Sequence, residues 1–515
     1  MHIGMLTDYI APDCTFGPAL AGATFRRNMQ MRGHEVTLVG PRPAPWMRKP
    51  PPGSIELSAG TFRQYPGVRF TFPWPPASFT QLPPFDIVHS NANTLLMRWA
   101  PVVRQLHGVP VLHTNTTYLP EFVHHAIPKG LLQFPGSSGF WNWATKSVEN
   151  SFARVFNAGD GLIVLCQGLV DYWQRMGLEV PIHVIQRPID VRIFNRKLGP
   201  DPYRGDFKRG ARMLCTARHS KEKALDRVVE IFAHHILPAN SDASLTLVGD
   251  GPAHKALVAQ AHALGVSHRV HFQGELPQRD LPDWLGHADL YLYTSLSETF
   301  GQVVSEALWM GIPVVGFDDK MGVAHQVKHD FNGLLIDPHA RDADGEFAAA
   351  AAALLSDNGR RRTLAENAAL RQRETSAPEI VYAAYEAAYA SAKEHYAVHP
   401  PAHVGRPGPV QAMQMTWRYL LPWTWQHATV LASGVIPSGY RPNSKAPLDA
   451  APDQPADEGY AHDGGSSLAH LPQWMGPGAS ASGGGREDVA AAGQTAAAQT
   501  AAAQTAAAQT ESSID

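Results

Sequence analysis

Two carboxylates stand on either side of a predicted helix start. Glu298 lies in a short polar loop, and Glu306 lies inside the helical run that spans residues 302–310. The start of such a helix offers free backbone N–H groups and the positive end of the helix dipole, which together bind anions. Two hydroxyl-accepting carboxylates around a phosphate-sized anion site suit a sugar that is attached to a nucleoside diphosphate.

Two basic side chains follow a predicted strand that lies earlier in the chain. Residues 213–217 form an apolar run, Arg218 comes directly after it, and Lys223 follows in the same loop. A single surface arginine or lysine is usually just solvated. At the carboxyl end of a parallel strand, the two can instead clamp a diphosphate, because arginine binds such oxygens through paired hydrogen bonds. We therefore expect Arg218 and Lys223 to bind a diphosphate.

The elements that must position these groups alternate between strand and helix. An apolar run at residues 288–294 predicts a buried strand, the helical run follows it, and residues 312–317 predict the next strand. Gly311 ends the helix, and Pro313 prevents its continuation. This alternation is typical of a parallel α/β sheet.

The beginning of the chain shows the same alternation. Residues 2–8 predict a strand, residues 18–31 a helix and residues 36–40 a second strand, with Gly17 in the loop before the helix. This order opens a doubly wound sheet, in which ligands collect at the carboxyl ends of the strands. The loop lacks the Gly-x-Gly-x-x-Gly fingerprint, so a nicotinamide-type site is disfavoured. We expect two α/β domains with a cleft between their sheet edges.

The segment around the two glutamates resembles the Glu-x7-Glu signature of retaining glycosyltransferases of the GT-B group 1 (family 4) class. The shared residues are Ser-x-x-Glu-Thr-Phe-Gly at 295–301, Glu-Ala at 306–307 and Met-Gly-Ile-Pro-Val-Val at 310–315. The basic pair lies in a stretch similar to the family's Gly-Arg-x4-Lys-Gly-x-Asp, with alanine in place of both glycines. The resemblance covers about residues 1–395. It implies the α/β GT-B fold, in which two Rossmann-like parallel-sheet domains face each other across a cleft.

The resemblance also implies roles for the residues at the second-domain edge. Glu298 would bind the hydroxyls of the transferred sugar, and Glu306 would bind the hydroxyls of the ribose. The backbone amides of Phe300 and Gly301 would bind the diphosphate. The basic pair would stabilise the departing diphosphate.

Three further site residues come from the same resemblance. Gly17 would let the first-domain backbone approach the phosphates, and the backbone of Leu276 would contact the nucleobase. His113 ends a strand predicted at residues 109–114 and would face the donor sugar as part of the catalytic set. A histidine after an apolar strand is otherwise often a satisfied edge residue, so that alternative stays open.

No metal or other cofactor is expected. The three cysteines, Cys14, Cys166 and Cys215, are far apart, which excludes a disulfide scaffold and a cysteine-based zinc site. Residues 342–344 have the Asp-x-Asp form of metal-dependent glycosyltransferases, but they precede a helix and are better interpreted as an N-cap. The basic pair and the helix dipole can stabilise a leaving diphosphate without Mg²⁺.

The chain is expected to divide into five parts. Residues 1–190 form the acceptor-side domain and residues 191–375 the nucleotide-sugar-binding domain, with a polar linker within 195–210. Residues 376–397 form a helix that, by the resemblance, crosses back to the first domain. Residues 398–437 are an aromatic-rich extension that docks on the body or lies at an interface. Residues 438–515 are a low-complexity tail that we expect to be disordered.

The location and the acceptor surface are less constrained by the sequence. Residues 121–157 mix aromatic and basic side chains, and they either pack on their own domain or form an acceptor or membrane-facing surface.

A net charge of -3 argues against nucleic-acid binding. Without a signal peptide or a spanning apolar run, we expect a cytoplasmic protein, with peripheral association with the inner face of the membrane left open.

The resemblance predicts a metal-independent hexosyltransferase. It would move glucose or mannose, from UDP-glucose or GDP-mannose, to an acceptor hydroxyl with retention of configuration. The acceptor is a glycolipid or phospholipid, as in lipid-glycosylating members of the family, or a soluble glycan in polysaccharide synthesis. A nucleotide-sugar epimerase or hydrolase would use the same donor cleft, whereas a non-catalytic binding protein is disfavoured because the clamp and both glutamates occur together.

Overall fold

The described part of the chain forms two parallel sheets, whose strands lie between His2 and Ile336. The computed structural model describes residues 1–8, 10, 17–43, 49–62, 69–71, 77–92, 95–116, 137–296, 298–420 and 435–436. All of these belong to one compact unit, Met1–Pro472. The predicted tail at residues 438–515 lies outside the described residues.

The first sheet has seven parallel strands in the order β3-β2-β1-β6-β7-β8-β9. Its strands are β1 (His2–Thr7), β2 (Glu35–Pro41), β3 (Ile55–Leu57), β6 (Ile87–Asn91), β7 (Val111–Asn115), β8 (Leu162–Val164) and β9 (Ile182–Val184). Strand β1 lies between β2 and β6, so that Met5 pairs with Leu38 on one side and with His89 on the other. This order is that of a doubly wound sheet, as the sequence predicted.

Helices cover both faces of the first sheet because β1 is apolar on both. Ile3 and Met5 face a core shared with α1 (Gly17–Met31). Leu6 faces the opposite core. That core is built with α3 (Leu95–His107), α5 (Ser137–Phe156) and α6 (Gln167–Arg175). Side chains that alternate between two buried faces are expected of a central parallel strand.

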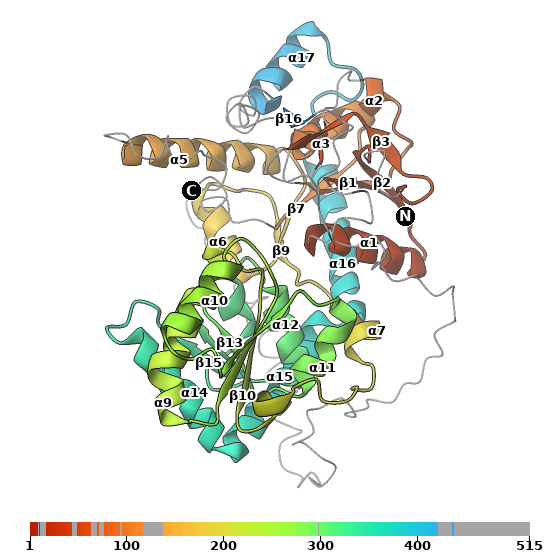
Figure 1. Cartoon of the computed structure of the whole chain (residues 1–515). Coiled ribbons are helices and arrows are strands. Elements are labelled where there is room, and N and C mark those ends of the chain that lie inside the picture. Colours follow the sequence, from red (N-terminus) through yellow and green to blue (C-terminus); the bar gives the residue numbers. More distant parts are fainter. Residues whose placement is uncertain are drawn as a thin grey trace, which may run out of the picture. The chain divides into compact units, whose positions relative to one another are not determined.

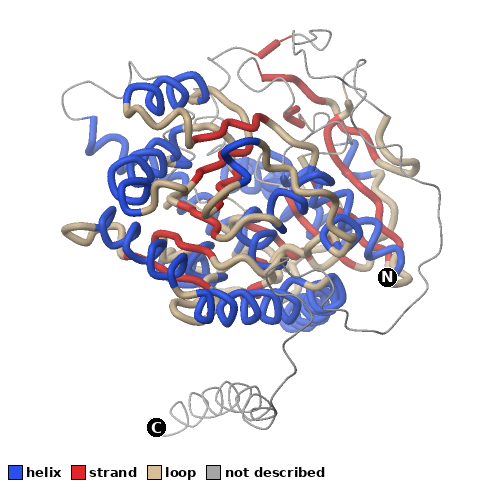
Figure 2. Tube along the Cα trace, turned by 60° about the horizontal axis from the view of Figure 1, so that its bottom comes forward, coloured by secondary structure: helices blue, strands red, loops and turns tan. Residues whose placement is uncertain are grey.

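The second sheet has six parallel strands in the order β12-β11-β10-β13-β14-β15. These are β10 (Arg212–Thr216), β11 (Ser244–Val248), β12 (Val270–Gly274), β13 (Leu290–Tyr293), β14 (Val314–Phe317) and β15 (Gly333–Ile336). One continuous apolar core surrounds them. Helices flank the strands (Figure 2). The prediction of two parallel-sheet α/β domains is confirmed.

The helices of the second domain connect its strands in chain order. They are α7 (Val191–Phe194), α8 (Leu225–Ile231), a π-helical turn (Phe232–Ile236), α9 (Leu237–Ala239), α10 (His254–Ala263), α11 (Leu281–Gly286), α12 (Gln302–Trp309), α13 (Gly322–Gln326), α14 (Ala343–Ser356) and α15 (Asn358–Ser376). Short 3₁₀ turns occur at Gly205–Lys208, Lys221–Lys223 and Gln278–Asp280. Asp342 caps α14 by accepting the N–H of Gly345 at 3.2 Å, which confirms the N-cap interpretation.

Helix α16 (Pro378–Val398) packs on the first sheet beside α1 (Figure 1). Its Glu386 accepts hydrogen bonds from Arg32 at 2.7 and 3.0 Å. Tyr389, from the same helix, contacts the buried His89 through its hydroxyl at 2.8 Å. Helix α16 therefore closes one face of the first domain.

The aromatic extension packs on the first domain in the part that the structure describes. It contains α17 (Pro409–Met415), a π-helical turn (Thr416–Leu420) and β16 (Val435–Ile436). Tyr419 packs against the first-domain core, and β16 pairs with β4 (Ala59–Phe62), which in turn pairs with β5 (Arg69–Thr71). The docked interpretation is confirmed for these residues. Among the described residues, no helix is both long enough and apolar enough to cross a bilayer.

One segment differs from the sequence prediction, and a second is only partly described. Residues 195–210 are packed rather than free, because the backbone N–H of Gly199 donates to Asp283 at 2.6 Å and the buried Tyr203 donates to the Trp284 carbonyl at 3.2 Å. An expected linker is therefore part of the second domain. The stretch at 121–157 contains the twenty-residue helix α5, and its residues 121–136 lie outside the described part of the chain.

Candidate functional site

A cavity opens at the carboxyl ends of the second-domain strands. Its walls come from the loops after β9, β10 and β13 and from the first turn of α12. The lining residues are Arg187, Ala217, Arg218, Lys223, Tyr293, Glu298, Thr299, Phe300, Gly301, Gln302 and Val303. Five of the predicted site residues therefore meet in one cavity, although they are spread over 84 positions of the chain (218–301).

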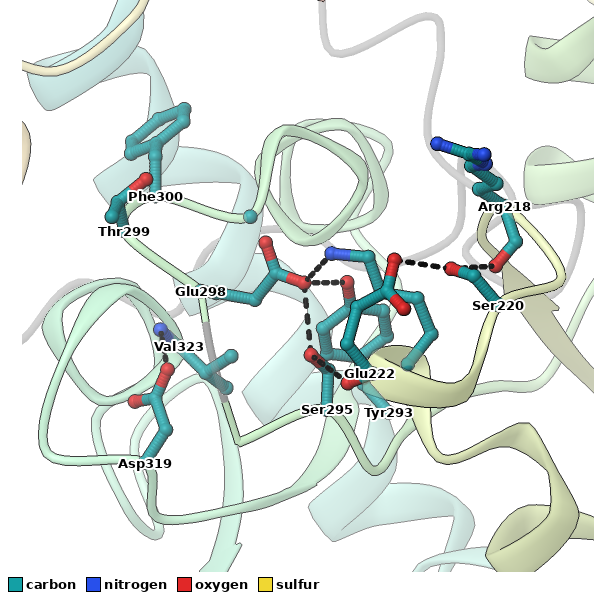
Figure 3. A network of polar contacts seen from close by, with 12 residues as sticks. Arg218, Ser220, Glu222, Tyr293, Ser295, Glu298, Thr299, Phe300, Asp319 and Val323 are labelled. Carbon is teal, nitrogen blue, oxygen red and sulfur yellow. Dashed lines mark hydrogen bonds and ion pairs between the residues drawn. The ribbon is translucent and has the colours of Figure 1, made fainter. Parts of the chain in front are cut away.

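Glu298 is the centre of a hydrogen-bond network in this cavity (Figure 3). One of its carboxylate oxygens, Oε1, accepts from the Lys223 ammonium, from the Tyr293 hydroxyl at 2.7 Å and from the Ser295 hydroxyl at 3.0 Å. Within the described residues, Oε2 accepts no hydrogen bond. The carboxylate is thus held firmly by one oxygen and has the other available for a ligand hydroxyl.

Glu298 remains ionised although it is largely buried. Burial by itself would raise the pKa of the carboxyl group. The charge of Lys223 and the hydrogen bonds from Lys223, Tyr293 and Ser295 outweigh burial, and the pKa lies below its usual value. At neutral pH the network therefore presents a fixed negative charge next to a lysine.

Two arginines bring further positive charge to the cavity. Arg218 lies two residues after β10, as predicted, and Arg187 lies three residues after β9 of the first sheet. In the part of the chain that the structure describes, neither guanidinium has an ion-pair partner. Arg187 was not among the residues predicted to form the site. The available signal was its place shortly after a strand end, which is the argument that identified Arg218.

The start of α12 supplies the anion-binding backbone. Gly301 precedes the helix with a φ of 78°, a left-handed conformation that favours glycine. The amide of Gln326 donates to the carbonyl oxygens of Phe300 and of Gly301, the latter at 3.3 Å. The first N–H groups of a helix have no acceptor within the helix, and Gln302 and Val303, in the first turn of α12, line the cavity. The local fold therefore fixes the loop and leaves its donors for an anion.

Glu306 lies away from the cavity wall, inside α12. It is buried, and its Oε1 accepts from the side chain of Gln278 at 2.9 Å. Burial raises its pKa to about 7, although hydrogen bonds from Gln278 and Gln302 oppose the shift. Leu276 lies two residues before Gln278 and is half-buried against the second-domain core. Glu306 and Leu276 thus belong to a region next to the cavity rather than to its lining.

His113 is not brought to the cavity. It is fully buried in β7, with its ring beside Phe156 at 5.3 Å, and an added Cβ at Gly159 would lie 2.7 Å from its Cδ2. Burial lowers its pKa to about 3, and neither ring nitrogen has a partner among the described residues. The expectation that His113 faces the donor is wrong for this structure. His113 lies two residues before the strand end and points into the α5 side of the sheet.

Gly17 is the first residue of α1, one position before the predicted helix start at residue 18. The loop before it, residues 11–16, lies outside the described residues. A second cavity is bounded by the first-sheet strand ends, α1 and α16, and its lining includes His89, Thr114, Tyr385 and Arg187. Arg187 therefore lines both cavities.

Together, the cavity residues can bind a diphosphate sugar. Arg187, Arg218 and the α12 backbone present positive charge to the phosphates, and Glu298 presents a carboxylate oxygen to a hydroxyl. Such groups can stabilise negative charge on a leaving diphosphate, because they are fixed before the reaction begins.

Two family models match separate parts of the chain. The model described as "Glycosyl transferases group 1" matches residues 205–371, which hold the cavity loops of the second domain. The model described as "Glycosyltransferase Family 4" matches residues 23–193 in the first domain. Each match therefore covers most of the domain that is built on one of the two sheets.

Curated relatives cover different shares of the chain. The alpha-monoglucosyldiacylglycerol synthase of Streptococcus pneumoniae is 26% identical over 363 residues, which are 65% of this chain and 78% of that protein. A D-inositol 3-phosphate glycosyltransferase of Catenulispora acidiphila is 30% identical over 303 residues, which are 55% of this chain and 66% of that protein.

Solved structures share the fold. The Anabaena protein HepE in complex with UDP superimposes with a TM-score of 0.56 at 18% identity, over 76% of this chain and all of that chain. The same protein in complex with UDP-glucose superimposes with a TM-score of 0.54 at 19% identity. This likeness confirms the two-domain architecture.

Proposed function

The chain belongs to the group 1 glycosyltransferases, and on this premise we propose that it moves a hexose from a nucleotide diphosphate sugar to an acceptor hydroxyl with retention of anomeric configuration. The observation that carries the proposal is the ionised Glu298, held by Lys223 beside the start of α12. The same cavity also contains the guanidinium groups of Arg187 and Arg218.

The donor would occupy the cavity in a defined direction. Its diphosphate would lie between Arg218 and the first turn of α12, and its hexose would donate a hydroxyl hydrogen bond to Oε2 of Glu298. The nucleoside would extend toward Glu306 and the backbone of Leu276. UDP-glucose is the first candidate because HepE was solved with UDP-glucose, and GDP-mannose is the second.

The proposed reaction uses the leaving group as the base. The bond between the anomeric carbon and the diphosphate oxygen breaks, and the acceptor oxygen forms its new bond on the same face of the sugar. The acceptor proton passes to an oxygen of the departing diphosphate. Arg218, Lys223 and the α12 backbone stabilise the charge on that diphosphate, so this mechanism requires no metal ion.

The proposed acceptor is a lipid hydroxyl. The support is the Streptococcus pneumoniae relative, whose name states that it makes alpha-monoglucosyldiacylglycerol. The second cavity adjoins the donor cavity at Arg187, so an acceptor hydroxyl that enters there would lie close to the transferred sugar. A soluble glycan or inositol acceptor is the second candidate, favoured by the inositol phosphate glycosyltransferase relative.

A thermal-shift screen of nucleotide sugars tests the donor assignment. A cognate donor at about 100 times its Kd stabilises the folded protein by about 2.7 kcal/mol. We expect a shift with UDP-glucose or GDP-mannose and a smaller one with UMP. If no nucleotide sugar shifts the Tm, the donor assignment is wrong. Incubation with donor alone then separates a transferase from an epimerase or hydrolase, which would turn the donor over rapidly.

A further inference from the structure

Among the described residues, three metal-ligating side chains meet between two loops of the second domain, outside the donor cavity. His219 follows β10, Asp250 follows β11, and His254 begins α10. One ligand atom from each lies within 4.8 Å of the others. Nδ1 of His219 is 2.9 Å from Nδ1 of His254, which is 3.8 Å from a carboxylate oxygen of Asp250.

The backbone fixes these two loops to each other. The N–H of His219 donates to the Asp250 carbonyl at 3.0 Å, and the N–H of Ala253 donates to the His219 carbonyl at 2.8 Å. Gly251 allows this approach, because a Cβ there would lie 2.5 Å from the His219 carbonyl oxygen. The three side chains are therefore positioned by rigid elements, as a metal site requires.

Ring packing holds the two imidazoles against each other. His219 is fully buried, and the two rings are nearly parallel, with an angle of 8° between their planes. Phe272 packs edge-on against both rings. Nε2 of His219 has no partner in the described part of the chain, so Nδ1 makes the only polar contact of this buried side chain.

We propose that His219, Asp250 and His254 bind a divalent transition-metal ion of the zinc class. Two imidazoles and one carboxylate form a ligand set that suits Zn²⁺ and its first-row neighbours. Zinc–nitrogen bonds of about 2.0–2.1 Å place two nitrogens of a tetrahedral site about 3.3 Å apart, so the rings need to separate by only a few tenths of an ångström. Asp250 and His254 are partly exposed, which leaves a fourth position for water.

Metal binding at this site would affect the loop that carries Arg218. His219 is adjacent to Arg218, which lines the donor cavity, whereas none of the three ligands does. A bound ion would tie the Arg218 loop to the turn between β11 and α10. The inference therefore goes beyond the proposed glycosyl transfer, and metal binding can be measured without any donor.

Zinc binding by the full-length protein tests the proposal. After EDTA treatment and its removal, Zn²⁺ is titrated in competition with a chromophoric chelator. We expect one tight equivalent in the wild type and at least about tenfold weaker binding in His254→Ala and in Asp250→Asn. His262→Ala is the matched control, because His262 is an exposed residue of the same helix and should leave the tight site unchanged.

A second measurement separates a lost site from a misfolded variant. The Tm of each variant is compared with that of the wild type in EDTA and again with Zn²⁺. We expect similar Tm values in EDTA and a zinc-dependent rise that His254→Ala lacks. The proposal is overturned if the wild type binds no tight equivalent, or if His254→Ala and His262→Ala bind Zn²⁺ equally well. In that case the two histidines merely share a hydrogen bond.

Discussion

At the scale of single residues, the proposed contact between Glu306 and the ribose predicts that donor binding depends on pH near neutrality. Burial raises its pKa to about 7, so the carboxyl group is protonated below that pH and ionised above it. An ionised carboxylate accepts hydrogen bonds from two ribose hydroxyls, and a protonated one loses part of that capacity. The proposed ribose contact should therefore weaken as the pH falls.

We expect the donor Kd to rise by up to about tenfold between pH 8 and pH 6, which follows from the ionised fractions one unit on either side of the pKa. Isothermal titration at both pH values measures it. Glu306→Gln resembles the protonated form, so its Kd should be high and nearly independent of pH. An equal pH dependence in the variant would assign the effect to another group, with Asp319 the first to examine because its pKa is raised to about 6 by burial.

Arg187 is a second residue-scale case, because it lines both cavities and has no ion-pair partner among the described residues. Its guanidinium should bind a phosphate or a hydroxyl of one of the two substrates. We expect Arg187→Ala to raise the KM of donor or acceptor by about tenfold or more, as the loss of a charge-assisted hydrogen bond does. Steady-state kinetics with each substrate varied in turn measures this. Arg362→Ala, an exposed change on α15, should leave both KM values unaltered.

At the scale of elements, the start of α13 supports the Glu298 loop. The N–H of Gly322 donates to the Glu298 carbonyl at 2.7 Å, and an added Cβ would lie 2.6 Å from that oxygen and from the Phe300 nitrogen. The Glu298 loop therefore packs against the start of α13, which has no room for a side chain at position 322.

Gly322→Ala should displace the loop and weaken donor binding by more than tenfold, because misplaced binding groups forfeit much of their effect. Donor titration of the purified variant measures the loss. Gly22→Ala is the control, since among the described residues a Cβ there meets only the Met5 methyl group, at 3.9 Å. Normal donor affinity in Gly322→Ala would show that the loop tolerates the shift.

Much of the fold could be predicted at this scale. The helix from Gln302 was expected with the observed start, because a polar loop precedes it and Gly311 follows it. Strands β3 and β4 were missed, since their Pro- and Gly-rich surroundings hide the pattern. The orientation of His113 could not be predicted either, because it depends on which face of β7 lies against α5.

The residues of the candidate site also include some that could be predicted from the sequence and some that could not. Residues that carry their own motif, such as Glu298 and Arg218, were predicted from the sequence and lie together in the cavity. Arg187 was missed although it follows a strand end, and the pair His219–His254 was missed because the two residues are distant in the chain. Only the fold brings such residues together.

At the scale of the whole molecule, α17 and the turn after it leave an apolar face exposed. Val410, Met413 and Trp417 are exposed at helical spacing, while Tyr419 anchors the segment on the first domain. If the acceptor is a lipid, this face is suited to contact a membrane surface, where tryptophan is favoured.

We expect the full-length protein to co-sediment with phosphatidylglycerol vesicles and the double variant Met413→Ser/Trp417→Ser to do so less. Val398→Ser, a change at another exposed apolar residue, is the control. Equal sedimentation of the two variants would exclude this face as the membrane contact.

The central claim is that Glu298 binds the transferred sugar in a glycosyltransferase reaction. The most direct measurement is the initial rate of hexose transfer from labelled UDP-glucose or GDP-mannose to diacylglycerol vesicles by Glu298→Gln. We predict a rate about two orders of magnitude below that of the wild type. Glu366→Gln, an exposed change on α15, should retain the wild-type rate. Full transfer by Glu298→Gln would contradict the account.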